Sequence, residues 1–154
     1  MRMVDVDYKR MKYVGFRMLL FGLESANQKT LDRVNKGVKV EDVKYIIKAA
    51  KAGLEPHVAV MFGYPWETDS DAVATLRLVW WLLKKGYAKT AQASLYSPNG
   101  NTEQHKFCKQ IYRATFYPEF WWNKLRNIHN KGDLKYLWRQ IKAGVNDLRV
   151  HTGV

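Results

Sequence analysis

The sequence predicts an α/β protein with parallel strands, and three observations lead to this prediction. Short apolar runs end at glycines, at Gly22 and Gly63. Each run is followed within a few residues by a carboxylate, Glu24 or Glu67, and by a helix-start pattern. Strand and helix signals alternate at lengths that favour parallel strands joined by right-handed crossovers. In such proteins ligands bind at the carboxyl ends of the strands.

The first part of the chain is predicted to hold a helix end, a strand and a short helix. Residues 7–14 look helical and stop at a glycine, as many helix C-termini do. Residues 16–22 are a continuous apolar run that suits a strand buried on both faces. Ser25 and Gln28 fit a capping box with serine at the N-cap, and the helix is expected to end at residues 35–37.

Two longer helices are predicted on either side of a second strand. Apolar residues at helical spacing predict a helix over residues 40–52. Pro56 can occupy the first position of a strand without losing a needed donor, and residues 57–62 would form that strand. The sequence TDSD at 68–71 predicts another helix start, with acids favoured by the helix dipole, and this helix runs to about Lys85.

A third strand and a helical tail complete the prediction. Residues 89–96 are expected to form the strand, and residues 97–100 a turn. No convincing strand follows, and the chain is divided into an α/β unit, residues 1–102, and a tail, residues 103–154, that packs on it. The tail helices are expected over 104–114, 119–129 and 133–148.

The composition is that of one globular domain. Of 154 residues 47% are hydrophobic, and no apolar run approaches the ~20 residues of a transmembrane helix. No secretory signal is recognisable, so we expect a cytoplasmic protein without a membrane partner. Cys108 is the only cysteine, which excludes an internal disulfide. It also excludes a zinc or iron–sulfur site held by cysteines of this chain alone.

The net charge is strongly positive. Lys and Arg outnumber Asp and Glu by 26 to 14, a formal charge of +12. This charge favours anionic partners such as nucleotides or nucleic acid, and it is equally compatible with a solvated basic surface. Aromatics among the basic residues of the tail are typical of a nucleic-acid surface. The alternative that we favour is a core that packs the tail on the α/β unit, made by Tyr112, Phe116, Trp121, Trp122 and Trp138.

Glu24 and Glu67 are expected to share one rim of the sheet if their strands are neighbours. Two rim carboxylates can perform general acid/base catalysis, as in a glycosidase. They can also hydrogen-bond the hydroxyls and amines of a bound nucleotide. The simpler interpretation is that each caps a helix or pairs with a nearby cation. For two acids that each follow a strand and a glycine, we favour a ligand role.

The turn after the second strand is more specific than either acid alone. Gly63 would let the backbone approach a ligand closely, and Pro65 fixes the turn. Tyr64 or Trp66 could cover a flat ring by stacking. The alternative is a plain strand–helix turn held by two aromatic rings.

Three segments resemble the fourth, fifth and sixth strands of radical S-adenosylmethionine (radical SAM) enzymes. FGLESANQKTLDRVNKG resembles the fourth-strand segment with its G-[VIL]-E-S stretch. Residues 53–68 resemble the fifth strand, which usually ends in GxPGET, and residues 91–102 the sixth, which often ends in P-x-PGT. The match covers about residues 10–102. The tail sequence IYRATFYPEFWWNKL resembles the cobalamin-dependent branch, which includes the anaerobic magnesium-protoporphyrin ester cyclase type.

The resemblance implies half of a TIM-like β/α barrel, with S-adenosylmethionine at the carboxyl ends of the strands. Glu24 and Ser25 would contact the ribose or methionine part of the cofactor. Gly63 and the strand before it, with Tyr96, would line the adenine side. The turn residues Tyr64, Pro65 and Glu67 are counted with the same cofactor site. In the whole enzyme the resemblance implies a [4Fe–4S] cluster and, for the branch, cobalamin.

The sequence departs from the family pattern at several points. The CxxxCxxC loop that holds the [4Fe–4S] cluster does not occur, nor does the glycine-rich stretch after the second strand. Trp66 replaces the glycine of GxPGET, and Asn99 the second proline of P-x-PGT. We therefore expect the C-terminal half of a longer iron–sulfur oxidoreductase or transferase that is not catalytic alone.

The expected partner is the N-terminal half of the barrel. Without it, the first strand has an exposed edge, which is a liability for pairing or aggregation. We expect the isolated chain to form a homodimer through that edge or to cover it with the tail. Two other functions remain open. One is a basic nucleic-acid-binding module of an RNA-modifying enzyme, and the other is a hydrolase that uses Glu24 and Glu67.

Overall fold

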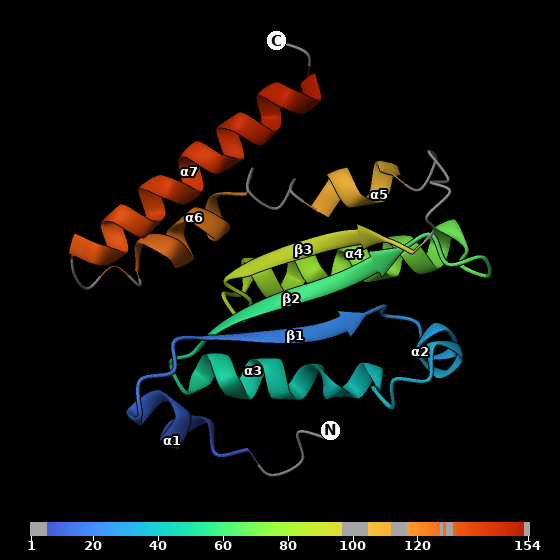
Figure 1. Cartoon of the computed structure of the whole chain (residues 1–154), viewed down its shortest axis with the longest axis horizontal. Coiled ribbons are helices and arrows are strands. Elements are labelled where there is room, and N and C mark those ends of the chain that lie inside the picture. Colours follow the sequence, from blue (N-terminus) through green and yellow to red (C-terminus); the bar gives the residue numbers. More distant parts are fainter. Residues whose placement is uncertain (1–5, 97–104, 112–116, 127, 129–130, 153–154) are drawn as a thin grey trace.

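A three-stranded parallel sheet forms the centre of the computed structural model, which describes residues 6–96, 105–111, 117–126, 128 and 131–152 (Figure 1). Of residues 105, 140 and 143–152 only the backbone is described. The strand order is β1 (Met18–Glu24), β2 (Glu55–Phe62) and β3 (Thr90–Leu95). The helices are α1 (Tyr8–Tyr13), α2 (Gln28–Val34), the 3-10 turn η1 (Val40–Asp42), α3 (Val43–Lys51), α4 (Asp69–Lys84), α5 (His105–Gln110), α6 (Pro118–Leu125) and α7 (Lys131–Thr152).

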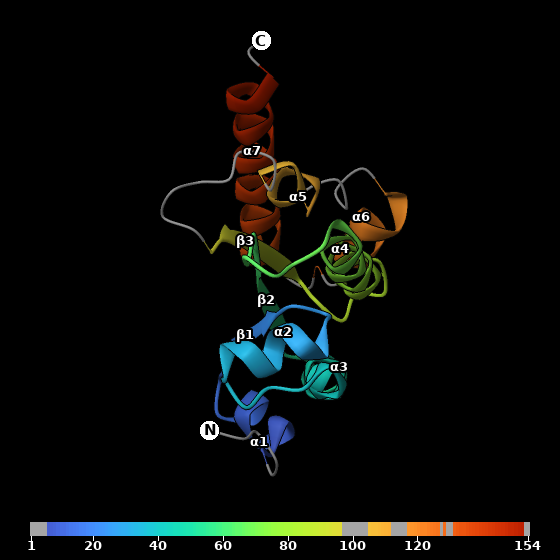
Figure 2. The same ribbon diagram turned by 90° about the vertical axis from the view of Figure 1, so that its right-hand side faces the viewer.

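Helices α3 and α4 cover one face of the sheet, as the end-on view in Figure 2 shows. Alternate residues of β2 point to that face, and Val58, Val60 and Phe62 are buried there. They join a core with Leu76 and Val79 of α4. The predicted α/β fold is confirmed, because β1 pairs with β2 and β2 with β3, both in parallel. The connection between each pair of strands contains a helix on this face, α3 or α4.

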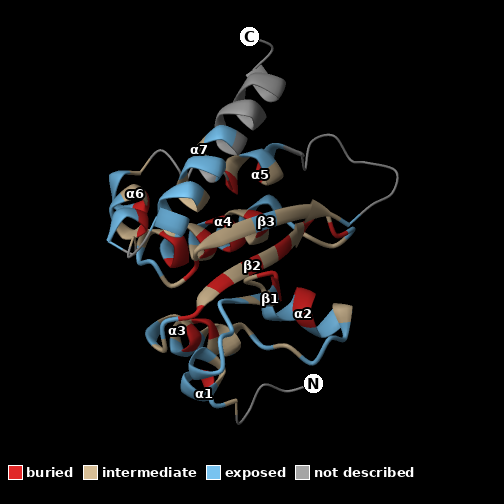
Figure 3. Ribbon diagram, turned by 60° about the vertical axis from the view of Figure 1, so that its left-hand side comes forward, coloured by how far each residue is buried: buried red, intermediate tan, exposed pale blue. Residues whose placement is uncertain are grey.

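The opposite face of the sheet is more open, and β1 is its most exposed strand (Figure 3). Leu20 is 69% exposed and Met18 is also exposed. In the register of the sheet Leu20 lies beside His57, which lies beside Thr90. His57 Nδ1 and Thr90 Oγ1 are 2.6 Å apart in a hydrogen bond. In a closed barrel this face would be the interior.

The N-terminus of α4 is fixed by the predicted capping motif. The Asp71 amide donates to Thr68 Oγ1 at 3.2 Å, and the Asp71 carboxylate accepts from the Thr68 amide at 3.0 Å. Because the hydroxyl also donates to the carboxylate, this pair lowers the pKa of Asp71. The cap places the turn after β2 at the carboxyl end of the sheet.

Removing this cap gives the first testable prediction. We expect Thr68→Ala to lower the free energy of unfolding by about 1 kcal/mol, since an orphan amide loses its acceptor. Urea unfolding followed by circular dichroism measures the change. Thr68→Ser keeps the hydroxyl and should unfold close to the parent chain; equal losses in both variants would contradict the capping role.

Two predicted boundaries in the first crossover are wrong. Ser25 is not the N-cap of α2. Asn27 takes that position, and its side chain accepts from the Thr30 amide at 3.3 Å. The first strand begins and ends two residues later than predicted, so Glu24 closes β1 and does not follow it. A β-bulge between Gly22 and Glu24 accounts for the longer strand end.

The tail helices share the core of the sheet only in part. Phe107, Ile111 and Phe120 are buried with the residues of α4, and Phe62 stacks on Phe107 with ring centroids 5.9 Å apart. Trp121 is partly buried against the same core. The predicted core residues Tyr112 and Phe116, and the turn at 97–100, lie outside the described residues.

The prediction that Trp122 and Trp138 are core residues is wrong. Trp122 is 62% exposed and Trp138 is 59% exposed. Trp138 is exposed because the opposite side of α7 contacts the rest of the protein. Asp133 and Tyr136 of α7 contact Arg17 at the amino end of the sheet. Trp138 follows them by five and two residues, which at about 3.6 residues per turn places it on the other side of the helix. Figure 1 shows α7 rising away from the sheet beyond this point.

Candidate functional site

Glu24 is held at the carboxyl end of β1 in an unusual backbone conformation. Its φ of 59° lies in the left-handed region, which non-glycine residues seldom adopt. Only 7% of the residue is exposed, and its carboxylate forms an ion pair with Lys36 just after α2. Gly22 leaves space for this carboxylate, because a Cβ at that position would lie 2.9 Å from Glu24 Oε1. The left-handed backbone of Glu24 thus places its carboxylate, paired with Lys36, at the carboxyl end of the sheet.

Ser25 lies beside Glu24 and joins the β1–α2 turn to α4. The residue is fully buried, and its Oγ accepts from the Asn27 amide at 3.1 Å. Thr75 Oγ1 donates to the Asp71 carbonyl and accepts from the Ala26 amide at 3.0 Å. Ser25 Oγ lies 3.4 Å from Thr75 Oγ1. Ser25 is therefore a buried structural residue that holds the β1–α2 turn against α4.

The β2–α4 turn closes through a hydrogen bond between Gly63 and Glu67. The Gly63 amide donates to Glu67 Oε2 at 2.7 Å, and Gly63 has a φ of 86°. The Glu67 amide donates to the Tyr64 carbonyl at 2.9 Å, which completes the turn around the exposed Pro65. Burial raises the pKa of Glu67, while the Gly63 amide lowers it in part. Glu67 Oε1 is buried and has no hydrogen-bond partner among the described residues.

Three aromatic rings gather at the same end of the sheet. Tyr64 stacks on Trp66 with centroids 5.5 Å apart and tilts against Tyr96 at 4.8 Å. The Arg33 guanidinium of α2 lies 5.3 Å from the Trp66 ring centroid. Burial, followed by the charges of Glu24 and Glu67, raises the pKa of Tyr64 to about 12. The Trp66 Nε1 donor is buried without a partner in the described part of the chain.

The structure thus brings the predicted residues from three strand ends toward one rim. The charges of Glu24 and Glu67 both raise the pKa of the Tyr64 hydroxyl, and the ring of Tyr96 packs on the Tyr64 ring. Each carboxylate already has a partner, Lys36 or the Gly63 amide, which favours binding and shaping of the turn over acid/base catalysis. The sequence reasoning missed Arg33 and Lys36. Arg33 lies two residues before the helix stop at Asn35 and Lys36 directly after it, and this position at the end of α2 is the signal that could have indicated them.

Metal ligands are not grouped in the part of the chain that the structure describes. No three His, Cys, Asp or Glu side chains lie together there in a way that could hold a metal ion. Cys108 is half-buried on α5, and burial raises the pKa of its thiol. A [4Fe–4S] cluster bound by three thiolates does not fit this chain, which has one cysteine. No helix among the described residues is long and apolar enough to cross a membrane.

Comparison with known proteins supports the family indicated by the sequence motifs. No curated protein matches the sequence. The family model of the Radical SAM superfamily matches residues 1–79, just over half of the 154 residues. The matched range contains β1, β2 and most of α4, with both the FGLES segment and the GYPWET turn. The chain therefore belongs to the radical SAM superfamily.

Proposed function

We propose that this chain supplies the ribose and adenine side of an S-adenosylmethionine site and that it is not catalytic alone. The observation that carries the proposal is a pair of buried, unpartnered polar atoms beside stacked rings. Trp66 Nε1 is a donor and Glu67 Oε1 an acceptor, and neither has a partner among the described residues. A purine edge offers complementary groups, an amine that donates and ring nitrogens that accept.

The other rim residues have roles that follow from their contacts. Glu24 is a carboxylate oriented by Lys36 and suits the hydroxyls of a ribose. Tyr96 is exposed on one side and offers a ring to a flat base. Gly63 and Pro65 set the path of the turn, and Ser25 positions the rim. S-adenosylmethionine supplies the radical chemistry after which the superfamily is named.

The cluster would be held by a partner, the N-terminal half of the barrel, which would pair with the free edge of β1. Two observations support this pairing. In the described residues β1 is hydrogen-bonded on the β2 side only, and its apolar Met18 and Leu20 are exposed. A groove of about 600 Å³ runs beside β1 between Leu20 and the segment from Lys36 to Tyr45. Homodimerisation through the same edge is the alternative.

The proposal is tested by titrating the 154-residue chain with two ligands followed by calorimetry. 5′-Methylthioadenosine contains the adenine and ribose without the amino acid, so we expect it to bind as well as S-adenosylmethionine. Glu24→Gln should weaken both about tenfold, because a charged hydrogen-bond acceptor is lost. Tyr96→Ala should weaken both about 2- to 10-fold.

The matched control is Tyr13→Ala, which removes an exposed tyrosine of α1 at the far end of the sheet. This variant should bind both ligands like the parent chain. Loss of affinity in all three variants, or no saturable binding by the parent, would contradict the site. Anaerobic iron–sulfide reconstitution of the chain should give no cluster signal in electron paramagnetic resonance. A cluster signal would contradict the proposal that the cluster is held by the partner and not by this chain.

The cobalamin-dependent branch is a further part of the proposal. Its support is the resemblance of the tail sequence IYRATFYPEFWWNKL, in which Ile111 and Phe120 join the core of the sheet. The tail helices thereby share the core of the sheet. A cobalamin absorption spectrum in the enzyme completed with its N-terminal half would support the branch, and a completed enzyme without that spectrum would count against it.

A further inference from the structure

The exposed side of α7 carries one tryptophan in a row of lysines. Lys131, Lys135, Trp138 and Lys142 are separated by four, three and four residues, so they follow one stripe along the helix. All four are exposed. The Lys142 ammonium lies 5.7 Å from the Trp138 ring centroid. We name these four residues and the adjacent, exposed Arg139 the α7 stripe.

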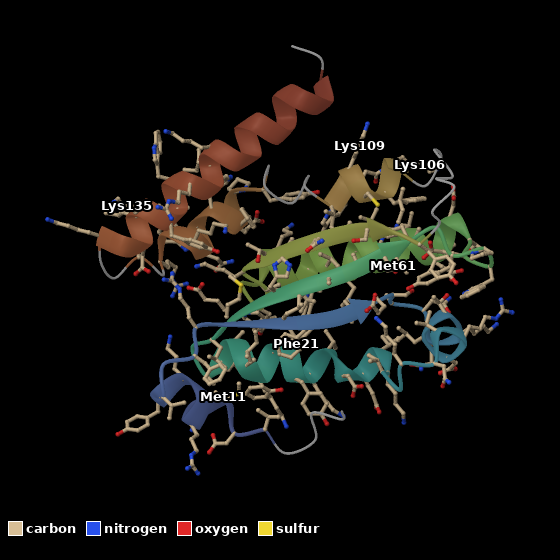
Figure 4. The ribbon with its side chains drawn as sticks, in the orientation of Figure 1. Met11, Phe21, Met61, Lys106, Lys109 and Lys135 are labelled. Carbon is tan, nitrogen blue, oxygen red and sulfur yellow. The ribbon has the colours of Figure 1, made fainter. Side chains whose placement is uncertain are left out.

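The stripe is accessible and almost free of negative charge. Asp133 is the only acidic residue between 131 and 142, and its carboxylate accepts from Arg17 at 3.1 Å on the inner side of the helix. Figure 4 shows Lys135 on the outer side of α7, away from the sheet. Four exposed cations therefore share one side of α7 with an exposed indole, and the ammonium of Lys142 lies against its ring. This surface is separate from the rim at the carboxyl ends of the strands.

We propose that the α7 stripe binds single-stranded nucleic acid. Phosphates would contact the three lysines and Arg139, and one base would stack on Trp138. Stacking on an aromatic side chain within a positively charged track is how proteins hold single strands without sequence preference. Duplex bases are already stacked on each other, so a duplex can use the cations but not the indole.

A membrane surface is the other anionic partner that a basic helix can fit, and the geometry argues against it. A membrane-bound helix separates its cations from a continuous apolar face that enters the lipid. On α7 the lysines lie on the same stripe as Trp138, and of its two described aliphatic neighbours Leu134 is exposed whereas Ile141 is half-buried. Inserting Trp138 into lipid would bring its neighbouring charges with it, which is costly.

The proposal is tested by fluorescence anisotropy of labelled 20-nucleotide RNA and DNA single strands with the whole chain. Four phosphate contacts predict a slope of about −3 in the logarithm of affinity against the logarithm of salt concentration. Trp138→Ala should weaken binding about 5- to 150-fold, and Trp138→Phe should retain most of the affinity. Lys135→Ala with Lys142→Ala should reduce the slope by about 1.4.

The matched control removes two lysines from another helix. Lys44 and Lys48 of α3 also lie over an aromatic ring, that of Tyr45, at 5.3 and 5.6 Å. Acidic Glu41 and Asp42 precede them, so Lys44→Ala with Lys48→Ala should change the affinity less than threefold. All the substituted side chains on α7 are exposed, and circular dichroism melting should be the same for each variant.

Three results would overturn the proposal. The first is equal binding of the parent chain and Trp138→Ala. The second is equal weakening by the α3 and α7 lysine pairs, which would show that only net charge matters. The third is flotation with phosphatidylcholine–phosphatidylserine vesicles, lost in Trp138→Ala, together with no oligonucleotide binding at low salt. Failure of the proposed S-adenosylmethionine site would leave all these results unchanged.

Discussion

Replacing Phe62 by alanine is expected to lower the free energy of unfolding by about 3–5 kcal/mol. Phe62 is the last residue of β2 and is fully buried. Its ring stacks on Phe107 of α5, so one side chain joins the sheet to the tail. Alanine would lose the transfer free energy of the ring and leave a cavity that the sheet backbone cannot close. Such a loss is a large share of the stability of a domain this size.

Urea unfolding of the 154-residue chain measures this effect. Phe62→Leu keeps an apolar side chain of similar volume and should lose less than the alanine variant. Phe16→Ala removes the same ring from an exposed position and should change the stability by no more than about 0.5 kcal/mol. A loss below 1 kcal/mol for Phe62→Ala would contradict the shared core.

A double-mutant cycle separates the stacking from the burial. Phe107→Ala, alone and together with Phe62→Ala, should give a coupling energy of about 0.5–1.5 kcal/mol. The cycle also tests whether the tail packs on the sheet in solution. Strict additivity of the two losses would mean that the rings do not contact each other.

The parts of the fold that local signals determine were predictable from the sequence. The TDSD motif gives the N-terminus of α4 at Thr68, because the hydroxyl and the carboxylate three residues later satisfy each other's amides. Asn35 ends α2 in the left-handed conformation, as predicted for a helix stop. The position of Glu24 and Glu67 at one rim of the sheet was also predictable, because neighbouring parallel strands bring their carboxyl ends together.

The missed features depend on contacts between distant segments. Ser25 and Asn27 can both cap a helix, and the choice is made by Thr75, which is fifty positions after Ser25 and engages its hydroxyl. The exposure of Trp138 depends on which side of α7 contacts Arg17. The amino-acid composition of the tail does not reveal which side that is. A tryptophan among lysines has the same sequence pattern whether its helix packs or projects.

The second large effect concerns Lys124, a buried cation at the amino end of the sheet. The residue lies on α6 and is 6% exposed. Its ammonium donates to the Lys89 carbonyl at 3.3 Å and lies 4.8 Å from the Phe120 ring centroid. Burial first, and then the charge of Lys89, lower the pKa of Lys124 to about 8, while Glu55 acts in the opposite direction.

This low pKa predicts how stability changes with pH. Between pH 8 and 10.5 the unfolded chain carries a proton on Lys124 that the folded chain has lost, so stability rises with pH in that interval. Below pH 8 both states are protonated, and the folded state bears the full cost of the buried charge. The difference between a pKa of about 8 and the ordinary 10.5 corresponds to about 3 kcal/mol.

We therefore expect Lys124→Met to stabilise the chain at pH 7 by about 1–3 kcal/mol. Methionine retains the apolar length of the side chain and removes the charge, and the lost hydrogen bond to Lys89 offsets part of the gain. Urea unfolding at several pH values measures the difference. The advantage of the variant should shrink as the pH rises from 8 to 10.5, because the parent then folds with a neutral amine.

Lys135→Met on the exposed side of α7 is the control for the change in net charge. At pH 7 this variant should change the free energy of unfolding by no more than about 0.5 kcal/mol, because the Lys135 side chain is exposed. If Lys124→Met is less stable than the parent at pH 7, the contacts of the ammonium outweigh the cost of burying it. In that case Lys124 holds α6 to the sheet as a cation.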